Sequence, residues 1–132
     1  MKPAKPDLLL RTMAVLAIAF GLLTIASGGR TLFGAEAVRQ SAGAYVPFVL
    51  WFNFAAGFAY VVAGAGLWLQ RLWAVRLAAA IAAATLLVFA AFGVHVMTGG
   101  AYEMRTVAAM TLRSVVWLGI AWLASRRAAR PG

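Results

Sequence analysis

The chain has 132 residues, of which 64% are hydrophobic and 11% are charged. Soluble domains carry about 25% charged residues, so this composition excludes a protein with a fully wetted surface. The net charge is +9, but Lys and Arg flank long apolar runs, which favours contact with anionic lipid head groups over nucleic-acid binding. The chain contains no Cys, which excludes disulfides, thiol redox chemistry and thiolate metal sites.

Four apolar stretches are long enough to cross a bilayer, since about 20 helical residues span a hydrocarbon core of about 30 Å. We therefore predict an all-α fold, a bundle of four transmembrane helices in one domain over residues 1–132, with helices at 8–27, 47–69, 72–97 and 105–125. Gly28-Gly29 is expected to end the first helix as a C-terminal breaker. Pro47 suits the first turn of the second helix.

The first apolar run follows Lys2 and Lys5, as a signal peptide does. Ile25-Ala26-Ser27 fits the small-residue cleavage rule poorly. We therefore expect this segment to be retained as a true first helix.

Lys and Arg are unevenly distributed between the two ends of the predicted bundle. The N-terminal segment, the second loop and the C-terminal tail hold eight of them, whereas the first and third loops hold three. The positive-inside rule then places both termini in the cytoplasm. We expect a multi-pass protein of the bacterial inner membrane, with Glu36 and Glu103 on its outer side.

Several polar residues fall at membrane depth, where such residues are costly and commonly functional. At the helical rise per residue, Asn53 lies ~9 Å and Arg113 ~12 Å below the outer surface. His95 lies just beneath that surface. All three belong to the outer half of the bundle.

Helical spacing groups these residues into two faces. One face carries Thr106, Met110, Arg113 and Trp117, and the other carries Asn53, Gly57, Tyr60 and Gly64. Both are predicted to point into the bundle, where Glu103, Asn53, Glu36 or a bound anion could neutralise Arg113. The predicted ligand-binding residues are Arg113, Asn53, His95, Glu103, Tyr60 and Trp117, and none is predicted to be catalytic.

Each candidate also has a structural interpretation. Arg113 could lock the bundle by pairing with a carboxylate, and Glu103 could simply favour a helix N-terminus. Asn53 could be an interhelical hydrogen-bonding residue, while Gly57 and Gly64 let backbones approach closely. These alternatives differ in whether the charge of Arg113 is already paired.

A metal site is a further alternative. His95 and Met97, with Met104 and Met110, offer soft ligands for Cu(I), although Met is also a common core filler. One His excludes bis-histidine haem, and phosphate-loop, dinucleotide and zinc-protease motifs are absent.

Two groups of residues carry a family resemblance. They are the run Leu8 to Arg11 with Gly21, Gly29 and Leu32-Phe33-Gly34, and Ala56-Gly57 with Gly64, Arg71 and Arg76 before an Ala-rich third helix. This layout resembles the DoxX family of small four-helix membrane proteins over most of the chain. Asn53 stands where that family often has an acidic residue, which argues against an acid-dependent role.

The resemblance implies a membrane subunit of the kind associated with quinone-linked sulfur oxidation or oxidative-stress complexes. We therefore expect a non-catalytic accessory or partner-binding subunit with a redox association, whose partners are the bilayer and a membrane protein or a second copy, with no nucleic acid. The alternative is a binding module for a small anionic or quinone-like ligand around Arg113. No cofactor is expected, quinone being the alternative.

Overall fold

The computed structural model describes residues 8–37, 40, 43–44 and 46–129. Its long helices are α1 (Leu8–Phe33), α3 (Pro47–Trp68), α4 (Leu72–Met97) and α5 (Met104–Ala129). All four are long and apolar enough to cross a membrane. The predicted fold class, an all-helical bundle of four membrane-spanning helices, is therefore confirmed.

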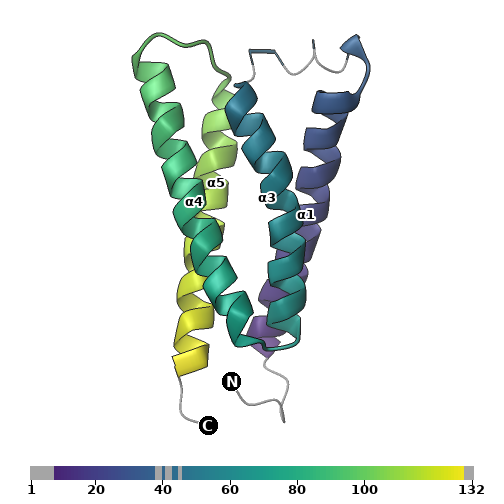
Figure 1. Ribbon diagram of the computed structural model, residues 1–132, viewed down its shortest axis with the longest axis vertical. Helices are drawn as coiled ribbons and strands as arrows, with labels where there is room; N and C mark the ends of the chain where they lie inside the picture. The colour runs from purple at the N-terminus through teal and green to yellow at the C-terminus, as the bar shows by residue number, and fades with distance from the viewer. Residues whose placement is uncertain (1–7, 38–39, 41–42, 45, 130–132) are drawn as a thin grey trace.

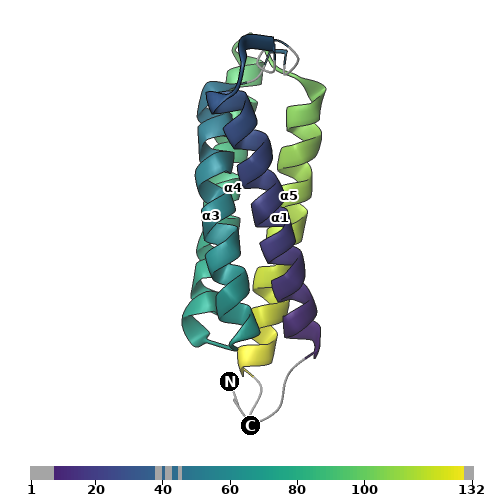
Figure 2. The same cartoon turned by 90° about the vertical axis from the view of Figure 1, so that its right-hand side faces the viewer.

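The helices run alternately up and down along the long axis of the molecule (Figure 1). We call the end that holds Leu8 and Ala129 the terminal end, and the end that holds Phe33 and Met104 the loop end. α1 packs on α3, α3 on α4, and α4 on α5. In Figure 2, α1 and α5 cross in the half of the bundle nearer the terminal end and diverge toward the loop end. The bundle is therefore least closed along the α1–α5 seam.

Glycines bring α1 and α3 into close contact. A Cβ added to Gly21 would lie 2.7 Å from the carbonyl oxygen of Gly57, and one added to Gly64 would lie 2.9 Å from that of Ala14. Real Cβ atoms essentially never come within 3.0 Å of such neighbours. Small residues at membrane helix interfaces permit this spacing, so the predicted role of Gly57 and Gly64 is confirmed.

The expected end of the first helix was wrong. α1 continues through Gly28-Gly29 to Phe33, because both glycines lie against Phe54 of α3. A Cβ on Gly28 would be 3.2 Å from the Phe54 Cβ. Packing against a neighbouring helix outweighs the weak helix preference of glycine, a difference of about 1 kcal/mol. The other three helices begin and end within four residues of the predicted positions.

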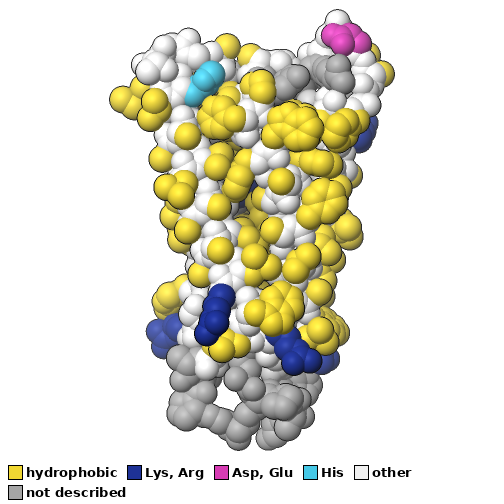
Figure 3. Space-filling view, viewed as in Figure 1, with side chains coloured by type: hydrophobic (Ala, Val, Ile, Leu, Met, Phe, Trp, Pro, Cys, Tyr) yellow, Lys and Arg dark blue, Asp and Glu magenta, His cyan; other side chains and the backbone are white. Residues whose placement is uncertain are grey.

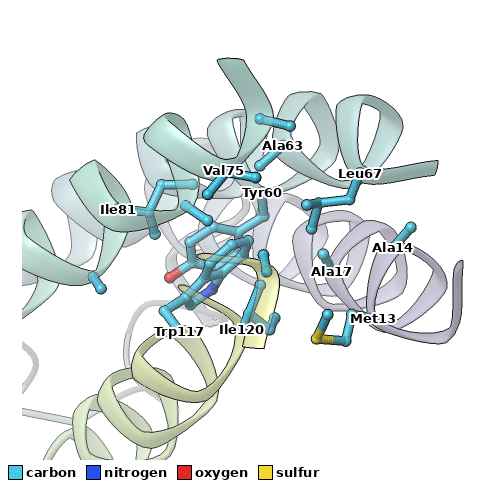
Figure 4. Packing of buried hydrophobic residues seen from close by; sticks show 14 of the residues in the cluster. Met13, Ala14, Ala17, Tyr60, Ala63, Leu67, Val75, Ile81, Trp117 and Ile120 are labelled. Carbon is cyan, nitrogen blue, oxygen red and sulfur yellow. The ribbon is translucent and has the colours of Figure 1, made fainter. Parts of the chain in front are cut away.

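The core has two parts. The larger part centres on Tyr60 and Trp117, both fully buried, and includes Leu10, Leu67 and Ile120 (Figure 4). A second cluster near the loop end joins Val46, Val49, Phe92 and Met110. Outside this core, apolar side chains cover the flanks of the bundle, while Lys and Arg gather toward the terminal end (Figure 3). Apolar flanks are what a lipid-facing surface requires, and basic residues near one end are typical of membrane proteins.

Candidate functional site

A cavity of about 510 Å³ opens near the loop end among α1, α3 and α5. α1 contributes the segment from Leu23 to Thr31, α3 contributes Leu50 and Asn53, and Glu103 precedes the start of α5. The remaining lining residues are on α5, namely Arg105, Thr106, Ala109 and Arg113. The volume lies within the range of about 300–1,000 Å³ that is typical of small-molecule sites.

The guanidinium of Arg113 forms hydrogen bonds to two neutral hydroxyl groups. Its Nη1 donates to Thr24 Oγ1 at 3.0 Å and to the Tyr60 hydroxyl oxygen at 3.3 Å. Its Cζ lies 4.9 Å from the ring centroid of Phe20, within cation–π range. These contacts fix the direction of the side chain but bring no negative charge to it.

Part of the guanidinium of Arg113 remains without a partner. Its Nε is buried and makes no hydrogen bond, and Nη2 takes part in neither of the two bonds to hydroxyl groups. Among the described residues, no carboxylate forms an ion pair with Arg113. The side chain therefore keeps N–H donors that have no acceptor among the described residues.

Glu103 was a predicted partner of Arg113, but it pairs with Arg105 instead. The Glu103 Oε1 lies 3.5 Å from the Arg105 Nη2. The two residues are neighbours at the start of α5 and both side chains are solvent-accessible, so their ion pair is weak, worth about 0–1 kcal/mol. The part of the lining that the structure describes thus holds Arg30, Arg105 and Arg113 against one carboxylate, which makes it electropositive.

Asn53 contributes a second unpartnered polar atom. Its Oδ1 is buried and has no hydrogen-bond partner, although the residue lines the cavity. A buried polar atom without a partner costs about 1–3 kcal/mol. Because the oxygen and nitrogen of an amide are assigned from their surroundings, this group can meet either a donor or an acceptor of a ligand.

Tyr60 and Trp117 support the site from beneath. Both side chains are fully buried, with ring centroids 4.8 Å apart, and Figure 4 shows the two rings against each other. Neither residue is among those that line the cavity. Tyr60 reaches the site through its hydroxyl group, whereas Trp117 packs behind it.

His95 and Met97 lie apart from this cavity. The Nε2–H of His95 donates to the carbonyl oxygen of Ala101 at 2.9 Å, and Gly100 lies directly against the imidazole ring. Met97 is 87% exposed, whereas Met110 is fully buried in the core. Among the described residues, no three His, Cys, Asp or Glu side chains are grouped to hold a metal ion.

Thr24 and Arg30 belong to the site, and sequence reasoning missed both. Thr24 lies nine residues before the end of α1 at Phe33, and Arg113 lies nine residues after the start of α5 at Met104. Equal distances from the same end place the two residues at the same depth on antiparallel helices. That signal was hidden because the first helix was expected to end at residue 27.

Comparisons of the chain with protein-family models, with curated proteins and with solved structures found no match.

Proposed function

We propose that this chain is a non-catalytic binding module of the bacterial inner membrane, and that its cavity holds a small anionic ligand against Arg113. The observation that carries this proposal is a part-buried guanidinium that faces a cavity and has no carboxylate partner among the described residues. An arginine remains charged at any depth, so its environment must supply the compensation.

The energetic argument begins with the cost of the charge. An arginine at the centre of a span costs about 2.5–3.5 kcal/mol on an insertion scale. Arg113 lies nearer the loop end, so its cost is smaller. Thr24 and Tyr60 solvate it only with hydroxyl dipoles. An anion in the cavity would add a charge-assisted hydrogen bond, which is stronger than the bonds to the neutral hydroxyl groups.

This arrangement favours the binding module over the accessory subunit expected first. A purely structural Arg113 would pair with a carboxylate, and the described carboxylate nearest in sequence, Glu103, pairs with Arg105. A quinone-like carbonyl is the second ligand chemistry, because it also accepts a hydrogen bond. It would bring no negative charge to a cavity whose described lining residues include three arginines and one glutamate, so we propose the anion as the ligand.

The topology is part of the same proposal. The described arginines of the terminal end, such as Arg71, Arg76 and Arg126, support a cytoplasmic location for both termini by the positive-inside rule. The cavity would then open toward the outer leaflet. Membership of the DoxX family is likewise a proposal, supported by the Gly and Arg pattern of the first two helices.

The decisive experiment compares two arginines within spans. Arg113→Gln removes the charge in the cavity. Arg11→Gln is the matched control, because Arg11 is in α1 near the terminal end, 4.4 Å from the Trp68 ring centroid, and does not line the cavity. Each purified full chain is titrated with phosphate, sulfate and a short fatty-acid carboxylate, and binding is followed by thermal shift.

We expect at least one anion to stabilise the wild type and Arg11→Gln, but not Arg113→Gln. The stabilisation should grow with ligand concentration, as binding to the native state alone requires. Equal shifts in wild type and Arg113→Gln, or no shift with any anion, would overturn the proposal. Stabilisation by an uncharged quinone, and by none of the anions, would show that the site binds a quinone-like carbonyl instead.

A further inference from the structure

We infer that the ligand is an amphiphile with a phosphomonoester head, which enters the cavity sideways from the bilayer between α1 and α5. This inference rests on the proposed function and adds both the source of the anion and its route. Its first support is the open seam, since α1 packs on α3 and α5 packs on α4, while α1 and α5 diverge toward the loop end (Figure 2).

The rim of the cavity on α1 is a lipid-facing surface. Leu23 lines the cavity and is 69% exposed, and Ala26 also lines it and is exposed. In a transmembrane bundle, residues exposed at this depth face acyl chains. The cavity therefore reaches the hydrocarbon region as well as the loop end, so an acyl chain can leave through the seam while the head stays inside.

The lining is divided along the membrane normal in the way that an amphiphile requires. Arg30 and Arg105 lie close to the loop end, at the level of lipid head groups, and Arg113 lies ~14 Å below the start of α5 at Met104. Beside this column of cations, the lining includes the apolar side chains of Leu23 and Leu50. A small soluble ion would meet the cations but leave the apolar wall without contacts.

The charge of the lining selects the head group. Among the described lining residues, three arginines against one glutamate leave an excess of two positive charges. A phosphomonoester carries about −1.5 to −2 near neutral pH, whereas a phosphodiester carries one negative charge. Arginine binds phosphate oxygens with parallel hydrogen bonds, and the unpartnered Asn53 amide can bind a further oxygen or hydroxyl of the head.

The test places the full chain in phosphatidylcholine nanodiscs that contain a minor fraction of phosphatidic acid or of phosphatidylglycerol. A third sample holds pure phosphatidylcholine with added glycerol 3-phosphate. Native mass spectrometry measures the bound molecules. We expect one phosphatidic acid per chain, bound about tenfold more tightly than phosphatidylglycerol, and no retained glycerol 3-phosphate. Arg113→Gln should abolish this preference.

Two tryptophan variants test the route. Ala26→Trp fills the rim of the seam, whereas Ala19→Trp adds the same side chain two turns away on the same exposed face, outside the cavity lining. We expect Ala26→Trp to weaken phosphatidic acid binding about tenfold, and Ala19→Trp to leave it unchanged. Both sites are exposed, so both variants should remain folded, as size-exclusion chromatography can verify.

The outcomes separate this inference from the function on which it rests. Tight binding of glycerol 3-phosphate that depends on Arg113 and ignores Ala26→Trp would keep the anion site and overturn the lipid route. Equal binding of phosphatidic acid and phosphatidylglycerol would overturn the phosphomonoester assignment. Phosphatidic acid binding that is unaffected by Arg113→Gln would overturn both proposals.

Discussion

Arg113 on α5 donates a hydrogen bond to the hydroxyl oxygen of Thr24 on α1 at 3.0 Å, across 89 residues of sequence. This bond crosses the seam along which the two helices are least closely packed. The same nitrogen also reaches Tyr60 on α3 at 3.3 Å. One side chain therefore links three helices through neutral partners while its net charge stays available to the cavity.

We expect Arg113 and Glu103 to be energetically independent. Arg113→Leu should leave the bundle as stable as the wild type or more stable, because the charge is removed and no carboxylate of the described residues loses its partner. Glu103→Gln should have a small effect, since its ion pair with Arg105 is accessible. The change in the free energy of unfolding of the double variant should then equal the sum of the two single changes within about 0.5 kcal/mol. Melting in detergent measures all four proteins.

A large loss in each single variant, with recovery in the double, would contradict this expectation. Breaking one side of a buried ion pair costs about 3–5 kcal/mol. That pattern would mean that the two side chains pair in the membrane, and Arg113 would be a structural lock.

Substitution of glycine by alanine should lower the stability of the bundle at the α1–α3 contact and raise it at Gly119. Gly21→Ala and Gly64→Ala each place a Cβ within 3.0 Å of a backbone oxygen of the facing helix, and the resulting overpacking should cost about 1–3 kcal/mol. Gly119→Ala is the matched control, because nothing lies within 4 Å of its added Cβ. It should gain about 0.5–1 kcal/mol from the better helix former. Thermal unfolding in a single detergent provides the comparison, and equal shifts for all three variants would show that α1 and α3 are further apart than described.

Reporters at the terminal end and at the loop end of the bundle test its orientation in the membrane. A C-terminal fusion should report a cytoplasmic location, because the N-terminal segment, the second loop and the C-terminal tail of the sequence hold eight Lys and Arg residues, whereas the first and third loops hold three. A reporter inserted after Gly99, in the α4–α5 loop, should report the opposite side. A periplasmic C-terminus would invert the leaflet toward which the cavity opens.

Copper titration tests the alternative at His95. We expect no stoichiometric Cu(I) complex with the purified wild type, because Met97 is 87% exposed while Met110 is fully buried in the core, so the soft side chains are not gathered around the imidazole. A competition assay with a chromophoric Cu(I) chelator measures this. A tight one-to-one complex that is lost in both His95→Ala and Met97→Ala would prove the expectation wrong.

The spans could be predicted from the sequence because each depends on a long apolar run, and Pro47 marks the start of α3. The extension of α1 could not, because Gly28 and Gly29 are helix breakers by local preference and only contact with Phe54 keeps them helical. Local spacing along a helix likewise identified the inward face of Arg113.

The hydroxyl partners of Arg113 required the tertiary structure. Threonine in an apolar helix commonly bonds its own backbone, as Thr85 does to Ile81 at 2.7 Å. Nothing local distinguishes Thr24 from such a residue. The pairing of Glu103 with Arg105 was also missed, because only Arg113 was considered as the partner of this carboxylate. Arg105 is two residues away in the sequence and forms the ion pair instead.

Because the site lies between α1 and α5, it can form only late in the synthesis of the chain. The ribosome delivers α1 first and α5 last, so Thr24, Tyr60 and Asn53 enter the membrane before the side chain that they are to surround. On the proposed function, the site is therefore completed only when α5 brings Arg113 into the bilayer, and a chain truncated before α5 should not bind the anion.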